Sequence, residues 1–361
     1  MRLWIIGNGF DLFHGLHTRY LDYKAYLCQK NPCICECANC MKKSEVLPRE
    51  VCCNCCKVKN SKSKCPVRKF CDLPRGEMKE DLWRDLEESC SIDIDELLKL
   101  LKEWIGIRGD LGVSGAEALA CGDSDFAALF MGSSLYDWFR DVETRELFKK
   151  GPNDQVLDID VEEDVFLTFN YTRTLQKIYK PKGKLWHVHG QLKDAVSACE
   201  KAVKGGPPFK AGRAIHSCLA FGSPDMTKGA LNAAIKRFRK SQGLRVDEVR
   251  KLHRCLMELI QLLSKDVEGR VKFVKKFVRE NCRDASCLDE VVVAGHSLGR
   301  IDAPYFEFLA EYFCDVKWRF LFYSESDLKN AFEFSKKHKL NGCYMPWDMA
   351  RKSCDKIERR K

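Results

Sequence analysis

The sequence predicts an α/β fold: a mostly parallel, Rossmann-like sheet with helices on both faces. Short apolar segments typical of buried strands alternate with segments whose apolar residues recur at helical spacing. Several of the apolar segments end in glycine or in a polar residue, as strands of open α/β sheets do at a binding edge. The 361 residues provide enough material for one large or two modest domains.

The first element is an apolar strand, Leu3 to Ile6, that breaks into the turn Gly7-Asn8-Gly9. Phe10 to Phe13 is predicted to begin a helix. A strand that turns directly into a helix points backbone N–H groups and the helix dipole at one place, which suits an anion. Glycines also let a phosphate approach the backbone closely. Because the motif is shorter than G-x-G-x-x-G, a tight turn without a ligand is the alternative interpretation.

Cysteines gather in the segment 28–76. Eleven of the 21 lie between Cys28 and Cys71, where apolar residues are too few to build a core. Two Cys-x-x-Cys pairs about a dozen residues apart suit a tetrahedral structural zinc, whose binding supplies folding free energy. The candidate ligands are Cys37 and Cys40 with Cys53 and Cys56, or with Cys52 and Cys55. A disordered insertion is the alternative; in both cases residues 28–76 interrupt the main fold.

The rest of the chain is expected to form one discontinuous α/β domain, residues 1–27 and 77–340. Apolar residues at helical spacing predict helical insertions at about 77–150 and 228–281. A strand at 317–323 and a helix at 324–337 complete the alternation. Residues 341–361 are expected to be a basic tail.

Two further predicted strands end in polar residues that could take part in catalysis. A buried-type strand, 165–169, ends at Asn170, and Thr172 is predicted to cap the helix that follows. A second strand, 185–190, ends with His189. Because the carboxyl ends of neighbouring parallel strands meet at one edge of a sheet, Asn170 and His189 are expected beside the first glycine turn. The segment 218–225 is predicted as another strand and turn.

The segment Gly295-His-Ser-Leu-Gly299 follows an apolar strand and matches the G-x-S-x-G nucleophile elbow of serine hydrolases. In α/β-hydrolases the acid and then the base follow the serine. Here the only histidine after Ser297 is His338, inside a lysine-rich segment expected to be exposed. Such a histidine makes a poor triad base. A serine esterase that uses Ser297 therefore stays an alternative function.

Charge and hydropathy exclude some classes of protein. The net charge of +10 is spread along lysine-rich helices, which favours solvated faces and at most weak, salt-sensitive contact with nucleic acid. No apolar run approaches 18 residues, so no membrane span is predicted. The first residues lack the pattern of a secretory signal, and a cytoplasmic location is expected. The oligomeric state cannot be read from the sequence.

Short motifs outside residues 28–76 occur in the order of one family. They are Ile5-Ile-Gly-Asn-Gly-Phe-Asp-Leu12, Gly15-Leu-His-Thr-Arg-Tyr20, Trp83-Arg-Asp-Leu-Glu87, Phe166-Leu-Thr-Phe-Asn-Tyr-Thr-Arg-Thr-Leu175, His187-Val-His-Gly190, Ala220-Phe-Gly222, and Gly295-His-Ser-Leu298 with Asp302 and Tyr305-Phe306. In these motifs the sequence resembles the abortive infection protein AbiH family of bacterial anti-phage proteins. The resemblance implies a role in phage defence, with a phage-derived trigger as a partner.

More distantly, the same series of turns resembles the sirtuin-like NAD-binding domains of defence proteins. The cofactor-binding residues that this resemblance implies are Gly7, Asn8, Gly9, Asp11, Thr18, Gly295 and Ser297. The glycine turn would hold the pyrophosphate, Asp11 would lie near the nicotinamide ribose, and Ser297 would hold the adenosine ribose. Asn170 would position a water or the ribose, and His189 would act as general base, for which its pKa is suited.

The function that the resemblance implies is hydrolysis of the nicotinamide–ribose bond of NAD, which would stop an infected cell. A module that senses a nucleotide or a phage component without turnover is a further alternative.

Overall fold

The computed structural model describes residues 1–30, 133–195, 222–242, 264–282 and 287–350, with some residues among 93–99, 218–220 and 246–260. The candidate zinc ligands Cys37, Cys40, Cys53 and Cys56, with the alternatives Cys52 and Cys55, lie outside the described residues, as does nearly all of the cysteine-rich segment.

Six strands form one parallel sheet, which confirms the predicted fold class. They are β1 (Arg2–Ile6), β2 (Val165–Thr168), β3 (Leu185–His187), β4 (Glu290–Ala294), β5 (Lys317–Phe322) and β6 (Asn341–Pro346). Their order across the sheet is β3-β2-β1-β4-β5-β6. β1 pairs with β2 on one side and with β4 on the other, so that Leu3 lies opposite both Val165 and Val291.

This strand order has a topological switch point between β1 and β4. The chain moves outward in one direction through β2 and β3, and in the other through β5 and β6. In doubly wound sheets the connections leave a crevice at this point, outside the carboxyl ends of the strands. The fold therefore marks the turns that follow β1 and β4 as the place for a ligand.

The chain divides into two compact units. The first comprises residues 1–19, 139–194 and 266–361, and it contains the whole sheet. The second comprises residues 20–138 and 195–265, and its described helices include α2 (Tyr20–Lys30) and α13 (Lys228–Gln242). Every residue discussed below as part of the candidate site belongs to the first unit.

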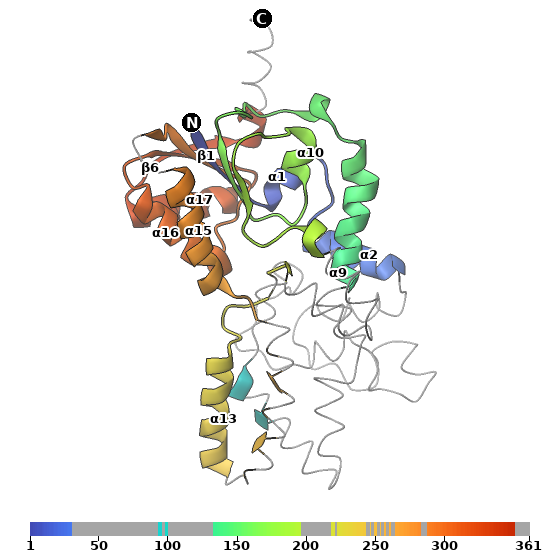
Figure 1. Ribbon diagram of the computed structural model, residues 1–361, viewed down its shortest axis with the longest axis vertical. Helices are drawn as coiled ribbons and strands as arrows, with labels where there is room; N and C mark the ends of the chain where they lie inside the picture. Colours follow the sequence, from blue (N-terminus) through green and yellow to red (C-terminus); the bar gives the residue numbers. More distant parts are fainter. Residues whose placement is uncertain are drawn as a thin grey trace, which may run out of the picture. The chain divides into compact units, whose positions relative to one another are not determined.

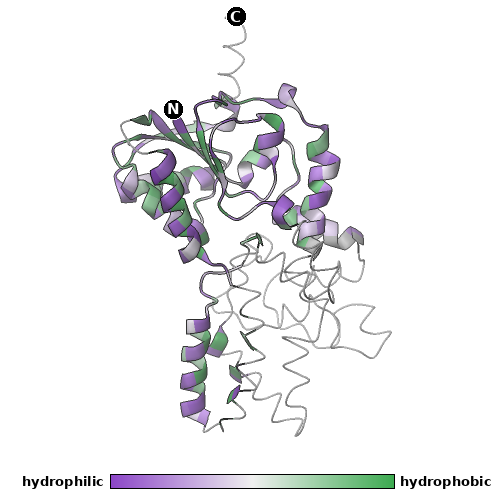
Figure 2. Ribbon diagram, in the orientation of Figure 1, coloured by the Kyte–Doolittle hydropathy of each residue, from purple (hydrophilic) through white to green (hydrophobic). Residues whose placement is uncertain are grey.

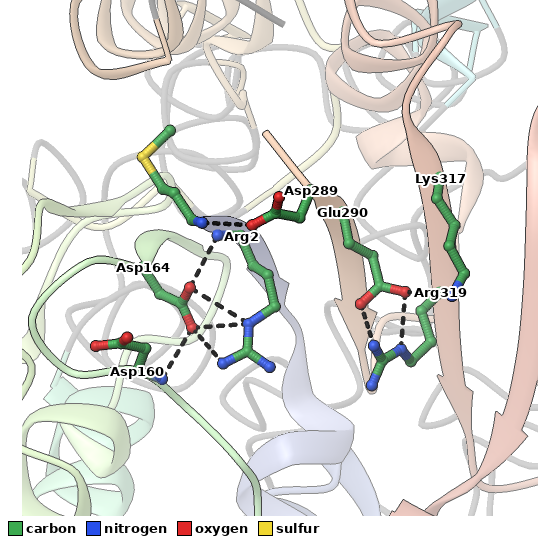
Figure 3. Close-up of a pocket in the computed structure, with 8 residues that line it drawn as sticks. Arg2, Asp160, Asp164, Asp289, Glu290, Lys317 and Arg319 are labelled. Carbon is green, nitrogen blue, oxygen red and sulfur yellow. Dashed lines mark hydrogen bonds and ion pairs between the residues drawn. The ribbon is translucent and has the colours of Figure 1, made fainter. Parts of the chain in front are cut away.

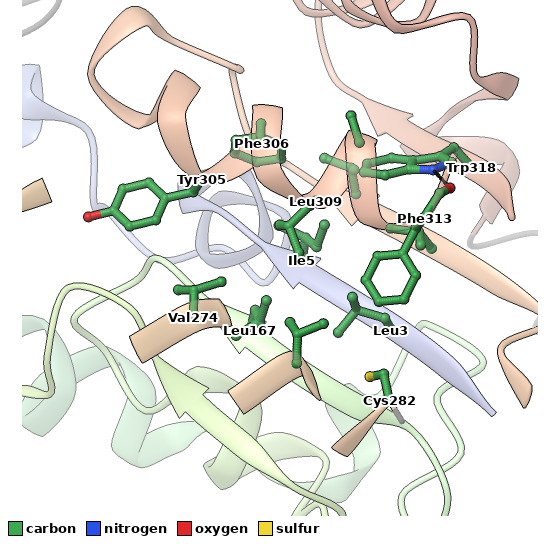
Figure 4. Packing of buried hydrophobic residues seen from close by; sticks show 14 of the residues in the cluster. Leu3, Ile5, Leu167, Val274, Cys282, Tyr305, Phe306, Leu309, Phe313 and Trp318 are labelled. Carbon is green, nitrogen blue, oxygen red and sulfur yellow. Dashed lines mark hydrogen bonds between the residues drawn. The ribbon is translucent and has the colours of Figure 1, made fainter. Parts of the chain in front are cut away.

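One face of the sheet packs against three helices: α15 (Val267–Asn281), α16 (Ala303–Tyr312) and α17 (Glu325–His338). Alternate strand residues such as Leu3 and Ile5 point into this core because successive side chains of a strand face opposite sides. Figure 4 shows them among Val274, Leu309 and Trp318. Burial of each such side chain contributes about 1.5–3 kcal/mol to stability.

The two short helices α1 (Asn8–Phe13) and α10 (Thr174–Ile178) lie on the other side of the sheet from α15, α16 and α17 (Figure 1). Figure 2 shows that α15 and α17 carry hydrophilic as well as hydrophobic residues, as expected for helices with one buried and one solvated side.

Three local predictions were wrong at the element boundaries. α1 begins at Asn8, not Phe10, so that Gly9 is already helical. Arg173, not Thr172, occupies the N-cap of α10, because the Thr172 hydroxyl donates to Asp11 instead. The described residues of the segment 218–225 form no strand and contribute one isolated bridge, between Ser223 and Ser264.

Two further segments belong to the sheet and its core, although their sequences did not predict it. The expected basic tail begins with β6, which is specified by pairing with β5: the rings of Phe320 and Tyr344 stack 5.7 Å apart across the two strands. α15, expected within a helical insertion, buries Val267, Val274 and Val278 in the sheet core.

Candidate functional site

The turns after β1 and β4 interlock at the switch point through three glycines. The Gly9 amide donates to the Gly295 carbonyl (2.7 Å), and the Gly7 amide donates to the Ala294 carbonyl (3.0 Å). A Cβ on Gly9 would lie 2.6 Å from the Gly295 Cα, and Gly295 itself has φ of +70°. The glycines are thus required for contact between two backbones.

This contact corrects the sequence-based picture of the first turn as an open phosphate cradle. The amides of Gly7, Gly9 and Phe10 all donate to carbonyls of the protein itself, Phe10 to that of Gly7 at 2.9 Å. A strand-to-helix turn leaves its amides open only when nothing packs against it, and here the second turn does. In this conformation the three amides are not available to a pyrophosphate.

Asn8 and Ser297 are the exposed residues of the two interlocked turns. The Asn8 side-chain amide donates to the Thr18 carbonyl (2.9 Å), and the Asn330 amide donates to the Ser297 carbonyl (3.0 Å). The hydroxyl of buried Thr18 has no hydrogen-bond partner in the part of the chain that the structure describes. Such a buried group gains from a ligand that can pair with it.

Asp11 connects α1 to the carboxyl end of β2. Its carboxylate is almost fully buried and accepts a hydrogen bond from the Thr172 hydroxyl at 2.6 Å. Burial raises the pKa of Asp11 to about 6, although hydrogen bonds from Thr172, Thr174 and Asn170 favour the ionised form and oppose the rise. Asp11 and Asn170, 159 positions apart in the chain, therefore meet at one edge of the sheet.

His187, two residues before His189, holds the end of β2 in place. Its Nδ1 lies 2.9 Å from the Asn170 carbonyl, and its Nε2 lies 2.6 Å from the Gln176 side-chain nitrogen. Nδ1 therefore donates to the carbonyl and Nε2 accepts from the amide. Burial lowers the pKa of His187 to about 4, so the ring is neutral near pH 7.

His189 and His296 share one carboxylate, that of Asp302. The His189 Nε2 lies 3.1 Å from Oδ1 of Asp302, and the His296 Nε2 lies 3.2 Å from Oδ2. The Leu298 amide donates to Nδ1 of His296, which leaves the proton of the neutral ring on Nε2. In the neutral form His189 likewise places its proton on Nε2, toward Asp302, so that its Nδ1 is an acceptor.

Aromatic rings surround this trio. Phe169 packs edge-on against His189 and His296, with ring centroids 5.0 and 4.6 Å away, and Tyr305 lies 5.9 Å from His189. The side chains of His189 and His296 are 4% and 6% exposed. Low polarity around the carboxylate strengthens its interaction with the imidazoles, because the effective dielectric constant is lower there than in water.

The sequence matches the model of the family described as Bacteriophage abortive infection AbiH over residues 3–323. The chain belongs to the AbiH family. It is thus an anti-phage abortive infection protein. The comparison with curated proteins found no match, and neither did the comparison with solved structures.

Sequence reasoning missed His296, Asp302 and Thr172 as site residues of this AbiH protein. In the second turn the elbow motif had pointed to Ser297 instead. The left-handed residues of that turn are Gly295 and Leu298, with φ of +70° and +56°, and Ser297 is neither of them. The exposed Ser297 also precedes a short 3-10 helix, Arg300–Asp302, before α16 begins. A nucleophile elbow instead places its serine at the strained point of a direct strand-to-helix turn. The geometry disfavours the esterase alternative.

A charged depression of about 410 Å³ lies at the opposite, amino edge of the sheet (Figure 3). Residues at or near the starts of β1, β2, β4 and β5 form ion pairs there: Arg2 with Asp164 at 2.9 Å, Arg319 with Glu290, and the amino group of Met1 with Asp289. These pairs satisfy the charges that crowd at the strand starts. None of the predicted site residues lines this depression.

The described residues contain neither a metal-binding cluster nor a membrane-spanning helix. In that part of the AbiH chain, no group of three or more histidine, cysteine or acidic residues is arranged to hold a metal ion. Among its helices, none combines the length and the apolar character that crossing a bilayer requires.

Proposed function

We propose that this AbiH protein binds NAD at the carboxyl edge of its sheet and hydrolyses the nicotinamide–ribose bond. Two observations support this proposal most: a carboxylate-held histidine, His189, follows β3, and the hydrogen-bonded pair of Asn170 and Asp11 lies at the end of the adjacent strand β2. Both lie beside the switch point, where sheets of this order bind nucleotides. Loss of NAD would stop an infected cell from supporting phage growth.

The proposed roles follow from the hydrogen bonds. Nδ1 of His189 accepts a proton from a water whose oxygen attacks C1′ of the nicotinamide ribose. The C–N bond breaks, and nicotinamide leaves with the electron pair as a neutral molecule. Asp302 holds His189 in the required tautomer and stabilises the imidazolium that forms, as the carboxylate of a catalytic triad does. Asn170 and Asp11 hold the ribose.

The phosphates and the adenosine ribose would lie along the two interlocked turns. Asn8 and Ser297 are exposed there and carry an amide and a hydroxyl that can donate hydrogen bonds. The role first expected of the Gly7 and Gly9 amides passes to these side chains, because the amides donate within the protein.

The residues that would act on NAD are nearly inaccessible: Asn170 is 7% exposed, His189 3% and Asp11 1%. NAD therefore reaches them only after the carboxyl edge opens. A closed resting site suits an enzyme that must spare the NAD of an uninfected cell, and a phage-derived trigger would supply the differential binding free energy that opening requires.

The test incubates purified protein with NAD, alone and with extract of phage-infected cells, and follows free nicotinamide. We expect turnover that Asn170→Ala and His189→Ala abolish and that the exposed control His17→Ala leaves unchanged. Ser297→Ala should keep turnover at saturating NAD and only weaken NAD binding, because it removes a binding hydroxyl and no reacting group. NAD binding without turnover under both conditions would show a nucleotide sensor instead. Covalent labelling of Ser297 by a fluorophosphonate would show the esterase.

A further inference from the structure

An exposed aromatic cluster lies where the edge strand β3 meets α15. The ring of Trp186 stacks on that of Phe273, with centroids 6.1 Å apart and planes 20° from parallel. The ring of Phe277, four residues further along α15, lies 6.1 Å from that of Trp186. Phe273 is 57% exposed and Trp186 36%. We call these three residues the Trp186 patch.

Phe277 packs against the core, but Trp186 and Phe273 project from it. Trp186 precedes buried His187 on β3, and successive residues of a strand face opposite sides. On α15, Val274 and Val278 bury the face that meets the sheet, while Phe273 projects from it. Exposed large apolar residues that cluster, unlike single ones, mark a place of interaction.

Basic residues outnumber acidic ones on the elements that carry the patch, although Lys275 lies over the ring of Phe308 and Arg270 donates to the Val188 carbonyl. Lys184, which is exposed, directly precedes β3, and α15 carries five basic residues against two acidic ones. The basic residues of α15 are Arg270, Lys272, Lys275, Lys276 and Arg279. The two acids, Glu268 and Glu280, face lysines at 3.1 and 3.9 Å in exposed pairs of a kind that contributes little stability. The surface keeps a clear positive excess.

We propose that the Trp186 patch binds single-stranded nucleic acid. Aromatic rings on which bases stack, set among cations that contact phosphates, are the two components of such sites. Phe273 offers its exposed face to a base, and Trp186 behind it extends the stacked column. An apolar protein partner is less suited, because it would have to bury Lys184 and Lys276 beside the rings. The site is separate from the proposed NAD site and does not depend on it.

The test measures fluorescence anisotropy of labelled oligo(dT) and oligo(U) of about 15 nucleotides, the upper end of typical site sizes, with the full-length protein. We expect Phe273→Ala to weaken binding about tenfold, and Trp186→Ala with Phe273→Ala to weaken it further, because stacking on each ring is lost. The matched control is Phe332→Ala, which removes an equally exposed phenylalanine (55%) from α17 and should change nothing.

Salt separates stacking from charge. Replacing Lys184 and Lys276 by Ala should reduce the slope of log K against log salt by about 1.4, since each phosphate contact on a single strand contributes about 0.7. Phe273→Ala should leave that slope unchanged. Circular dichroism checks that each variant is folded.

The proposal fails if wild type binds neither oligonucleotide at low salt, or if Phe273→Ala and Phe332→Ala bind equally well. It also fails if the aromatic variants instead abolish a dimer seen in sedimentation, which would assign the patch to a second copy of the chain.

Discussion

Nε2 of His189 lies 3.1 Å from Oδ1 of Asp302, and this contact joins the turn after β3 to the segment that leads into α16. The second oxygen of the same carboxylate faces His296, in the turn after β4. One side chain thus connects the end of an outer strand with the switch point. The predictions below test this connection and the elements around it.

Replacement of Asp302 by Asn should lower NAD turnover by about a hundredfold or more, because an amide at this position can donate to His189 and favours the wrong tautomer. The same change should leave NAD affinity nearly unaltered. Nicotinamide release and ligand titration measure the two effects. A variant with normal turnover would show that Asp302 is only a structural partner of the two histidines.

The raised pKa of Asp11 predicts a pH-dependent stability of defined sign. Because the folded-state pKa is about 6 and the ordinary value is 3.8, the folded protein binds the proton more tightly. The contribution of Asp11 to stability is therefore fully present below about pH 4 and is lost as the pH rises to about 6. Relative to Asp11→Asn, wild type should lose about 3 kcal/mol across this window.

Urea unfolding of wild type and Asp11→Asn between pH 4 and pH 7.5 provides the measurement. Subtracting the two curves removes the titration of all other groups. A difference that stays constant over this range would contradict the burial of a carboxyl group in this position.

His187 should show the opposite dependence. Burial lowers its pKa to about 4, so the folded protein binds the proton less tightly than the unfolded chain does. The contribution of His187 is fully present above about pH 6.5 and is lost as the pH falls toward 4. Compared with His187→Gln, wild type should lose about 3 kcal/mol on acidification. Thermal unfolding of both proteins over this range tests the sign. His17→Gln is the control, because the His17 side chain is 72% exposed.

Gly9→Ala should destabilise the protein by about 2 kcal/mol or more, because the new Cβ would lie 2.6 Å from the backbone of Gly295, which cannot move without displacing β4. Gly151→Ala is the matched control, since a Cβ there meets nothing within 4 Å. Urea midpoints compare the two. Equal midpoints would mean that the two turns do not interlock in solution.

The zinc site predicted from residues 28–76 remains a prediction. Freshly reduced protein should contain one zinc ion per chain, and Cys37→Ser combined with Cys40→Ser should remove it, because three or four thiolates are needed to hold a structural zinc. Elemental analysis after dialysis measures the metal. Protein that holds no zinc before mutation would favour the alternative of an insertion without metal.

The sequence by itself determined the elements whose signals are local. The apolar strand before Gly295 and the helix at 324–337 were both predicted, and they correspond to β4 and α17. Neighbouring residues specify them: a run of buried residues in β4, and a capping box of Ser324 with Asp327 at the start of α17. The alternation of these elements then fixed the parallel sheet, since parallel strands require crossover helices. It followed that Asn170 and His189 would lie at one edge.

Tertiary structure alone decided what faces each of these residues. Nothing local in the sequence shows that the Gly9 amide meets Gly295 rather than a phosphate, or that Thr172 donates to Asp11 rather than capping α10. β6 exists because β5 offers it an open edge, and Asp302 enters the site because both histidines point at it. The contacts of Gly9 with Gly295, of Thr172 with Asp11 and of His189 with Asp302 join residues more than a hundred positions apart. Their geometry depends on the packing of the whole sheet, which local patterns do not encode.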